Sequence, residues 1–351
     1  MEGNGAYNKA AVCQGNLVDI MSDLLNQAMA RFAKNVKPKT SYCIADLGAS
    51  QGRNSLSLIQ HILRHLQANF PEDAAAPEYM ILHEDQPSND YTTLLDTIAS
   101  PASYVHSFPN VFNGVISKSF YERLVPAASV DIFVSYISLQ WMSHVPTPLP
   151  GPIILFDDPE CARSLSSVNT AKWRQAGHND LINFLRLRAT ELVDNGSLCL
   201  AYPSNDGNQD MFDYFRLTRD GLRDTVAMGG LSSTTLDRIA VASILRTTDD
   251  FLAAAAQVPE LQVHDYQHVR MDVRFNHASE LVNFFTSTCL PTIEAAMTDD
   301  ERNSSRFRQV YNTCMAKSLS RVIGGRTRPF YEHFRVSYFF CHLTRRERAV
   351  P

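Results

Sequence analysis

The chain has 351 residues, 44% of them hydrophobic and 20% charged, so it can bury a full core as one large domain or two unequal ones. A formal net charge of −5 excludes a general attraction to phosphate backbones, and no apolar run approaches the ~20 residues that span a bilayer. We therefore expect a globular, cytoplasmic protein with no nucleic-acid and no membrane partner, since the polar N-terminus also lacks a signal-peptide core.

The seven cysteines are scattered, with no Cys-x-x-Cys pair and no histidine at metal-ligand spacing. Cys43, Cys199 and Cys341 fall inside apolar strand-like runs, where a small hydrophobic side chain is expected. The sequence therefore predicts reduced, mostly buried thiols that neither catalyse a reaction nor bind a metal.

The first predicted element is an amphipathic helix that begins at about Ala10, after a polar and glycine-containing start. Tyr7 and Gln14 flank its first turns. From position alone, either could be a surface residue at a fraying terminus.

The stretch from Tyr42 to Asn54 predicts a strand, a tight turn and the start of a helix. An apolar run ends at Asp46, and glycines follow at Gly48 and Gly52. Such glycines let the backbone approach a ligand closely, and the free N–H groups of the helix start favour an anion. The spacing Asp-x-Gly-x-x-x-Gly differs from the Gly-x-Gly-x-x-Gly of dinucleotide binders. It favours a Rossmann-like pocket for S-adenosyl-L-methionine (SAM), and the alternative is an ordinary strand-to-helix turn.

A second apolar run, at residues 79–82, ends in a group of acids. In doubly wound sheets an acid at the end of the second strand accepts hydrogen bonds from the cofactor's ribose hydroxyls. Asp85 is the candidate for this role and Glu84 is its rival. The alternative is that Glu84, Asp85 and Asp90 only solvate a turn.

A third apolar run, at residues 130–134, continues directly into Ser135, Tyr136 and a segment that contains Trp141. Ligands in open α/β sheets bind beyond the carboxyl ends of the strands, so these aromatic side chains are placed to shape a pocket. A buried structural tryptophan is the alternative.

The second half of the chain predicts further sheet elements and a helical unit. Four prolines between Pro146 and Pro152 form a stiff connection, and a helix at residues 168–193 ends at Asn195-Gly196 before another strand. Helices without intervening strands suggest a cap over the ligand edge. We therefore predict an α/β protein with a Rossmann-like core, residues 1–205, 260–275 and 332–351, and a mostly helical cap, residues 206–259 and 276–331.

Together these stretches resemble one family, the SABATH methyltransferases, which include the salicylic, jasmonic and benzoic acid carboxyl methyltransferases and the caffeine-pathway N-methyltransferases of plants. Six blocks occur in family order across roughly residues 1–200. They are Tyr7 through Gln14, Ile44-Ala-Asp-Leu-Gly with Gly52 and Asn54, Asp85-x-Pro-x-Asn-Asp-Tyr, Ser119-Phe-Tyr-x-Arg-Leu, Ser138-Leu-Gln-Trp with Val145-Pro146, and Asp180 through Gly196 with Phe-Leu-Arg-x-Arg-Ala at its centre.

The resemblance implies a class I methyltransferase fold and SAM as the cofactor, with S-adenosyl-L-homocysteine (SAH) as its product. It implies cofactor contacts at Tyr7, Asp46, Ala49, Asn54, Asp85, Gln86, Ser119 and Phe120, and the strand-end positions add Gly48, Ser135 and Tyr136.

The resemblance also implies that Gln14 and Trp141 hold the carboxylate of a small organic acid through their side-chain N–H groups, which are neutral donors suited to an anion. The product would be a methyl ester. No residue is expected to act as acid or base, because a carboxylate is already ionised at neutral pH. The site then has mainly to align the reacting atoms and exclude water.

The chain departs from the family pattern around the acyl pocket. Ile137 stands where a tyrosine is usual, and Gln140 stands where histidine or methionine is usual. Burying an amide against bare hydrocarbon is costly, so the acid is expected to carry a second polar group, as a compact di- or tricarboxylate or a hydroxylated or heteroaromatic acid does. The alternative is that Gln140 faces solvent or bonds a cap backbone group.

No counterpart of the Phe-Asn-Ile-Pro segment, associated with Mg²⁺ in several members, occurs near residues 237–244, so no metal is expected. The resemblance is compatible with a homodimer. Three other functions stay open, namely an N-methyltransferase of the same family, a nicotinamide-dependent oxidoreductase and a catalytically inactive binder.

Overall fold

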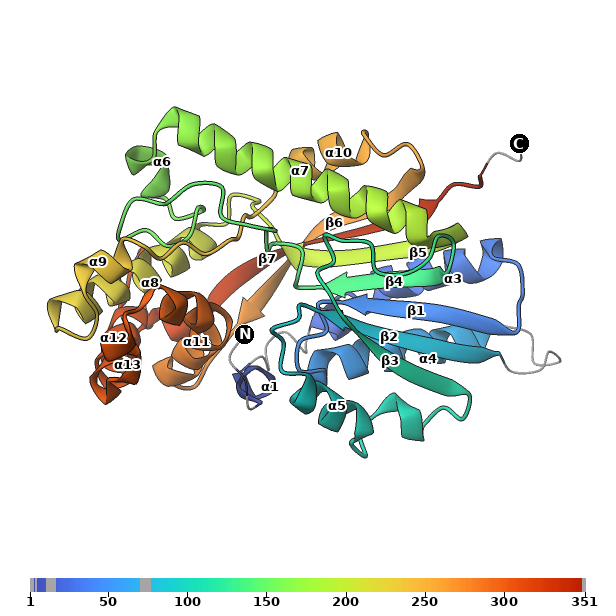
Figure 1. The fold of residues 1–351 in the computed structure, drawn as a ribbon, viewed down its shortest axis with the longest axis horizontal. Helices are drawn as coiled ribbons and strands as arrows, with labels where there is room; N and C mark the ends of the chain where they lie inside the picture. The colour runs from blue at the N-terminus through green and yellow to red at the C-terminus, as the bar shows by residue number, and fades with distance from the viewer. Residues whose placement is uncertain (1–2, 4, 11–16, 70–76, 349–351) are drawn as a thin grey trace.

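The structure is a computed structural model that describes residues 3, 5–10, 17–69 and 77–348 (Figure 1). Its centre is a seven-stranded sheet of order β3-β2-β1-β4-β5-β7-β6. Strands β1 to β5 pair in parallel, and β7 runs antiparallel to both β5 and β6. The strands are β1 Ser41–Leu47, β2 Glu78–Asp85, β3 Val111–Ser117, β4 Val130–Tyr136, β5 Leu192–Pro203, β6 Leu261–Val273 and β7 Phe334–Arg345. The predicted α/β class and Rossmann-like sheet are confirmed.

Helices cover both faces of this sheet. On one face, α3 Ser22–Asn35, α4 Arg53–Asn69 and α5 Tyr91–Ala99 pack against alternate residues of the central strands, such as Ile44 and Ile132. On the other face, α7 Ser167–Glu191 packs against the intervening residues, such as Ala45 and Phe133. A parallel sheet buried on both faces requires nearly continuous apolar strands, which explains the composition of β4.

The end of α7 differs from the prediction. Ser166 caps the helix by accepting a hydrogen bond from the Asn169 N–H, and the helix ends at Glu191 rather than at the Asn195-Gly196 pair. Asn195 has a φ of +62° within β5, where the register with β4 shifts. The Asn-Gly pair therefore forms an irregularity in the strand, because glycine and asparagine tolerate the left-handed conformation there as readily as at a helix end.

The remaining helices gather at one end of the sheet, on the left in Figure 1. Except in the short helix Asp299–Asn303, which has no buried residue, their apolar faces share one cluster with the ends of β6 and β7, through residues such as Met271 and Phe334. They are α8 Gln209–Ala227, α9 Ser233–Leu236, α11 Ala278–Ala296, α12 Asp299–Asn303 and α13 Ser305–Leu319.

One helix inside the range expected for the cap lies elsewhere. Helix α10, Thr248–Ala255, packs on α7, and its Phe251 and Ala254 join the sheet core. In the sequence, α10 belongs to a run of helices with no strand between them. The sequence pattern therefore does not distinguish it from the cap helices. With α10 assigned to the core, we propose a cap of residues 206–247 and 276–331.

Four short elements complete the described chain: α1 Ala6–Ala10, η1 Tyr104–His106, α6 Cys161–Ser164 and η2 Phe330–Glu332. Helix α1 lies against the turn that follows β1, where the Asn8 side chain donates to the Gln51 carbonyl at 2.8 Å and Arg53 donates to the Asn8 carbonyl at 2.8 Å. Within the described ranges, no helix is both long and apolar enough to cross a bilayer.

Candidate active site

The turn between β1 and α4 requires glycine. Gly48 and Gly52 have φ values of +80° and +91°, a region that other residues rarely adopt. A Cβ atom on Gly48 would lie 2.0 Å from the Ser138 Oγ. The Gly48 N–H donates to the Glu84 carbonyl at 2.9 Å and to its Oε2 at 3.1 Å, so the end of β2 holds this turn in place.

The two acids that end β2 have separate roles. The Asp85 carboxylate accepts hydrogen bonds from the Ser50 N–H at 2.7 Å and the Gln86 N–H at 2.8 Å, and it lines the main cavity. The Glu84 side chain is fully buried against Gly48, and its Oε1 has no partner among the described residues. Of the two candidates, Asp85 is the one that lines the cavity.

The Glu84 carboxyl makes a pH dependence testable. Burial, together with the neighbouring Asp85 carboxylate, raises the pKa of Glu84 to about 9 from its usual 4.5. Between about pH 4.5 and about pH 9 the native protein keeps the proton on Glu84, whereas the unfolded chain releases it. We expect the free energy of unfolding to fall as pH rises through this window, and to fall less in Glu84→Gln, which has no proton to release.

Urea unfolding at about pH 5 and about pH 8 measures this difference, because both values lie inside the window. Glu78→Gln, at an exposed position on the same strand, is the matched control and should keep the wild-type slope. Equal pH slopes for the wild type and Glu84→Gln would contradict a protonated Glu84.

One cavity of about 440 Å³ opens at the carboxyl ends of β1, β2, β4 and β5 and extends beneath the cap. Its cap side is apolar and aromatic and was not predicted from the sequence. No lysine, arginine or histidine occurs among its described lining residues. The aromatic and sulfur-containing residues on this side come from the cap and from the ends of β6 and β7, and they are Met211, Tyr214, Phe215, Met271, Phe275, Phe284, Phe285, Cys289, Phe334 and Tyr338.

Five of the predicted cofactor positions line this cavity: Tyr7, Gly48, Asp85, Gln86 and Phe120. Burial, followed by the Asp85 charge, raises the pKa of Tyr7, so its hydroxyl stays neutral beside that carboxylate. The cavity thus joins a buried acid, glycine backbone and two aromatic rings at the sheet edge. These are suitable contacts for the ribose, the methionine part and the adenine of SAM.

The other six predicted cofactor positions are not on the cavity wall: Asp46, Ala49, Asn54, Ser119, Ser135 and Tyr136. Ser135 donates to the Leu47 carbonyl at 3.0 Å, and the Tyr136 hydroxyl is buried in the core without a partner among the described residues. They end a strand that is buried up to Ser135, and the half-buried Tyr136 packs its ring against the core clusters, so neither side chain lines the cavity.

Asp46 lies behind the wall in a buried polar chain. The Ser55 hydroxyl donates to the Asp46 carboxylate and lies 2.9 Å from His83 Nδ1, and His83 Nε2 lies 2.8 Å from the Tyr104 hydroxyl. Burial raises the pKa of Asp46 to about 6 and lowers that of His83 to about 4. This series of hydrogen bonds fixes Asp46 beneath the glycine turn.

The predicted substrate residues Ile137, Gln140 and Trp141 all line the cavity, whereas Gln14 lies outside the described residues. Ile137 has a φ of +66°, a strained value for a β-branched residue. The Gln140 Nε2 donates to the Ile137 carbonyl at 3.1 Å, while its buried Oε1 has no partner among the described residues. Gln140 therefore lines the cavity and has a buried acceptor without a partner among the described residues.

The backbone around Trp141 is held from two sides. Trp141 forms a β-bridge with Ser243, and the Met142 N–H donates to the Ala242 carbonyl at 2.8 Å. The Tyr121 hydroxyl donates to the Trp141 carbonyl at 2.6 Å.

In the described part of the chain, no three His, Cys, Asp or Glu side chains come together as a metal site.

A family model described as SAM-dependent carboxyl methyltransferase matches residues 1–327. The chain belongs to this family. Its description confirms the predicted SABATH-type assignment and SAM as the family's cofactor.

Curated relatives agree with this assignment. Methyltransferase LUC1 of Fusarium sp is 28% identical over 71% of this chain and 64% of its own length, and Methyltransferase FUS9 of Gibberella fujikuroi is 28% identical over 76% and 70%. A benzoic acid/salicylic acid carboxyl methyltransferase of Petunia hybrida is 28% identical over 56% of each chain. The alignments thus cover between about half and 70% of the relatives' own lengths.

The family fold is also found among solved structures. Loganic acid methyltransferase with SAH superposes with a TM-score of 0.81, covering 99% of this chain and 98% of that chain at 15% identity. This likeness confirms the class I methyltransferase fold.

Proposed function

We propose that this carboxyl methyltransferase family member transfers a methyl group from SAM to the carboxylate of a small organic acid and releases the methyl ester and SAH. The single observation that carries the proposal is the cavity that brings Asp85 and Gly48 together with Trp141. It combines an acid suited to a ribose with a neutral N–H donor suited to an anion.

When bound, SAM supplies an electrophilic methyl group on a positively charged sulfur. The chain's own residues then need only bind and orient. A carboxylate is ionised at neutral pH, so the proposal assigns no base, and Trp141 with Gln14 would hold one carboxylate oxygen so that the other faces the methyl group. Effective molarities of ~10⁵ M or more for well-oriented reactants make such positioning sufficient for most of the acceleration.

The cavity wall narrows the acid class. No cationic side chain lies on the described lining to hold a second or third carboxylate, so of the expected acids the lining favours the hydroxylated or heteroaromatic acid over the compact di- or tricarboxylate. Gln140 uses its Nε2 on the Ile137 carbonyl and leaves Oε1 as an acceptor. The acid that fits has an apolar or aromatic body and one hydroxyl or N–H donor, as in a hydroxylated or heteroaromatic acid.

The direct test is methyl transfer from labelled SAM to a panel of such acids, with equilibrium binding of SAM and NAD measured in parallel. Transfer to a carboxylate with SAM binding supports the proposal. Transfer to nitrogen heterocycles alone would favour the N-methyltransferase alternative, and binding of NAD without SAM would favour the oxidoreductase.

Trp141→Phe is expected to lower kcat/KM for the acid about 10- to 150-fold, because it removes one hydrogen bond to a charged group, worth ~1.5–3 kcal/mol, while keeping an aromatic ring. SAH affinity should stay nearly intact. Gln14→Ala is expected to act in the same direction. Kinetics at saturating SAM and calorimetric SAH binding measure the two effects separately, and loss of SAH binding in either variant would contradict the proposed division of roles.

A further inference from the structure

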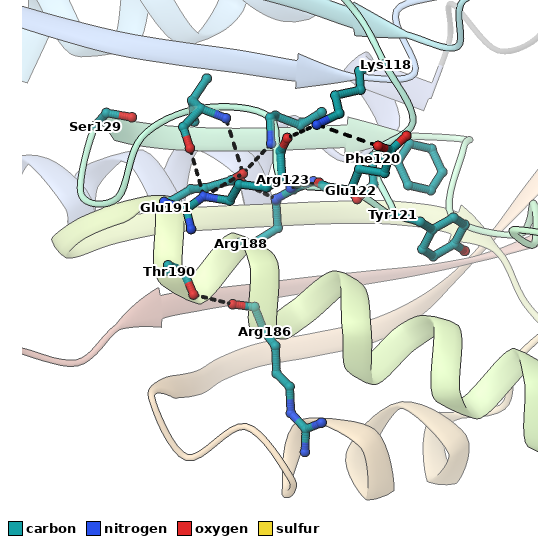
Figure 2. Close-up of polar contacts among 12 residues, drawn as sticks. Lys118, Phe120, Tyr121, Glu122, Arg123, Ser129, Arg186, Arg188, Thr190 and Glu191 are labelled. Carbon is teal, nitrogen blue, oxygen red and sulfur yellow. Dashed lines mark hydrogen bonds and ion pairs between the residues drawn. The ribbon is translucent and has the colours of Figure 1, made fainter.

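The 118–129 loop, which joins β3 to β4, carries Phe120 onto the cavity wall. The loop lies over the last turns of α7, and these turns contain the Phe-Leu-Arg-x-Arg-Ala segment at residues 184–189. Figure 2 shows the loop's polar groups converging on Arg188 and Glu191, whereas the Arg186 guanidinium points away from the loop. The proposed site otherwise assigns no role to this segment.

Arg188 bonds to three groups at once. Its Nε donates to Glu191 Oε2 at 2.7 Å, its Nη1 to the Phe120 carbonyl at 3.0 Å and its Nη2 to the Glu122 carbonyl at 3.1 Å. The guanidinium also lies over the ring of Phe133, 5.1 Å from its centroid. This fixed fork holds two peptide groups of the loop in one geometry.

Glu191 completes the arrangement from the other side. Its Oε1 accepts hydrogen bonds from the N–H groups of Leu124 at 2.6 Å and Val125 at 3.3 Å. Asn183, about two turns before Glu191 on α7, donates to the Tyr121 carbonyl at 2.9 Å. Side chains of α7 thus hold five peptide groups between residues 120 and 125.

The ion pair by itself need not add stability. Both side chains are 0% exposed, and a buried ion pair can commonly be replaced by packed apolar residues without loss of stability. What an apolar pair cannot do is bond to loop peptide groups. The pair therefore contributes a defined loop position.

The loop reaches both halves of the proposed site. Phe120 lines the cavity near the predicted cofactor residues, and the next residue, Tyr121, donates its hydroxyl to the Trp141 carbonyl at 2.6 Å. A displacement of the loop would therefore move a cofactor-side ring and a substrate-side donor together.

Resting on the proposed function, we propose that Arg188 and Glu191 are positioning residues that hold Phe120 against the cofactor and, through Tyr121, Trp141 against the acid. Neither residue touches the reacting atoms.

The primary test is Arg188→Lys, measured by SAH binding, kcat, KM for the acid and thermal unfolding. A single ammonium cannot reproduce the fork, so the SAH Kd should rise about tenfold and kcat/KM should fall about a hundredfold, since small misplacements carry costs of that size. Arg186→Lys, the same change at an exposed position on the same helix, is the matched control and should match the wild type.

Two milder variants separate the effect on the cofactor side of the site from the effect on the acid side. Glu191→Gln keeps the acceptor for Leu124 but removes the charge that orients Arg188. It should therefore raise the SAH Kd and lower kcat/KM, each by a smaller factor than Arg188→Lys does. Tyr121→Phe removes the hydroxyl that bonds the Trp141 carbonyl and the Arg246 side chain, and it leaves the bonds of Arg188 and Glu191 to the loop in place. It should leave the SAH Kd within about twofold and lower kcat/KM for the acid about tenfold.

The proposal is overturned if Arg188→Lys and Glu191→Gln lower the melting temperature while SAH Kd, kcat and KM stay at wild-type values, since the pair would then only stabilise the fold. If Arg188→Lys does not fold, the results for Glu191→Gln and Tyr121→Phe decide. A wild-type protein that binds no SAH and methylates no acid would instead overturn the proposed function, and this inference with it.

Discussion

Replacing Asp85 with alanine is expected to weaken SAM and SAH binding about 10- to 150-fold, because hydrogen bonds from the ribose hydroxyls to a charged carboxylate are worth ~1.5–3 kcal/mol. The carboxylate already accepts the Ser50 and Gln86 N–H groups at 2.7 and 2.8 Å, and this holds both oxygens beside the cavity. The substitution therefore removes an acceptor that is oriented before the cofactor arrives.

The same two backbone bonds mean that Asp85→Ala could act by disturbing the turn, so the ligand must be varied as well. The wild type should bind SAH more tightly than its 2′,3′-dideoxy analogue, and Asp85→Ala should bind the two equally weakly. Calorimetry on both proteins with both ligands gives the coupling between the carboxylate and the hydroxyls. An equal loss for both ligands would refute the ribose assignment.

The sheet could be predicted from the sequence because its local signals agree. The apolar run before Asp46, the two glycines and the helical period after them each indicate the same strand, turn and helix. Asp85 could be predicted for the same reason, since it ends a strand next to that turn. Local patterns therefore indicate the part of the cavity wall that the sheet supplies.

The cap-side wall could not be predicted in this way. Its residues come from α8, β6, α11 and β7, so only long-range packing brings them to one cavity. The periodicity of a helix indicates that one face is buried, and it does not indicate whether that face meets the sheet, another helix or a ligand. For this reason the helical pattern alone indicates neither the layer in which α10 packs nor the apolar lining of the cavity.

The direction of side chains at strand ends could not be predicted from the sequence either. Ser135 and Tyr136 end a strand beside the pocket, yet β4 is buried on both faces and its side chains enter the core. Position at the carboxyl end of a strand therefore predicts proximity to a ligand, and contact also depends on what covers the strand. Gln140 and Trp141 reach the cavity because they lie on the irregular segment beyond that strand.

Gln140 is expected to determine which acids react. Its Oε1 is buried at the cavity with no partner among the described residues, so an acid that brings a hydroxyl or N–H to it gains a hydrogen bond that the unsubstituted acid lacks. A site built to bond such a group can reject the analogue without it by up to ~10⁴, whereas a methylene difference gives only ~10–200-fold. The wild type should therefore prefer a hydroxylated aromatic acid strongly over the matching hydrocarbon acid.

Gln140→Met should abolish this preference, because methionine fills a similar volume and offers no strong acceptor. The measurement is the ratio of kcat/KM for the two acids in each protein, at saturating SAM. Gln175→Met, the same change at an exposed glutamine that bonds Asn179 on α7, should keep the wild-type ratio. If the ratio in the wild type is near one and Gln140→Met leaves it unchanged, Gln140 only supports the Ile137 carbonyl, and the strained loop rather than the substrate requires its amide.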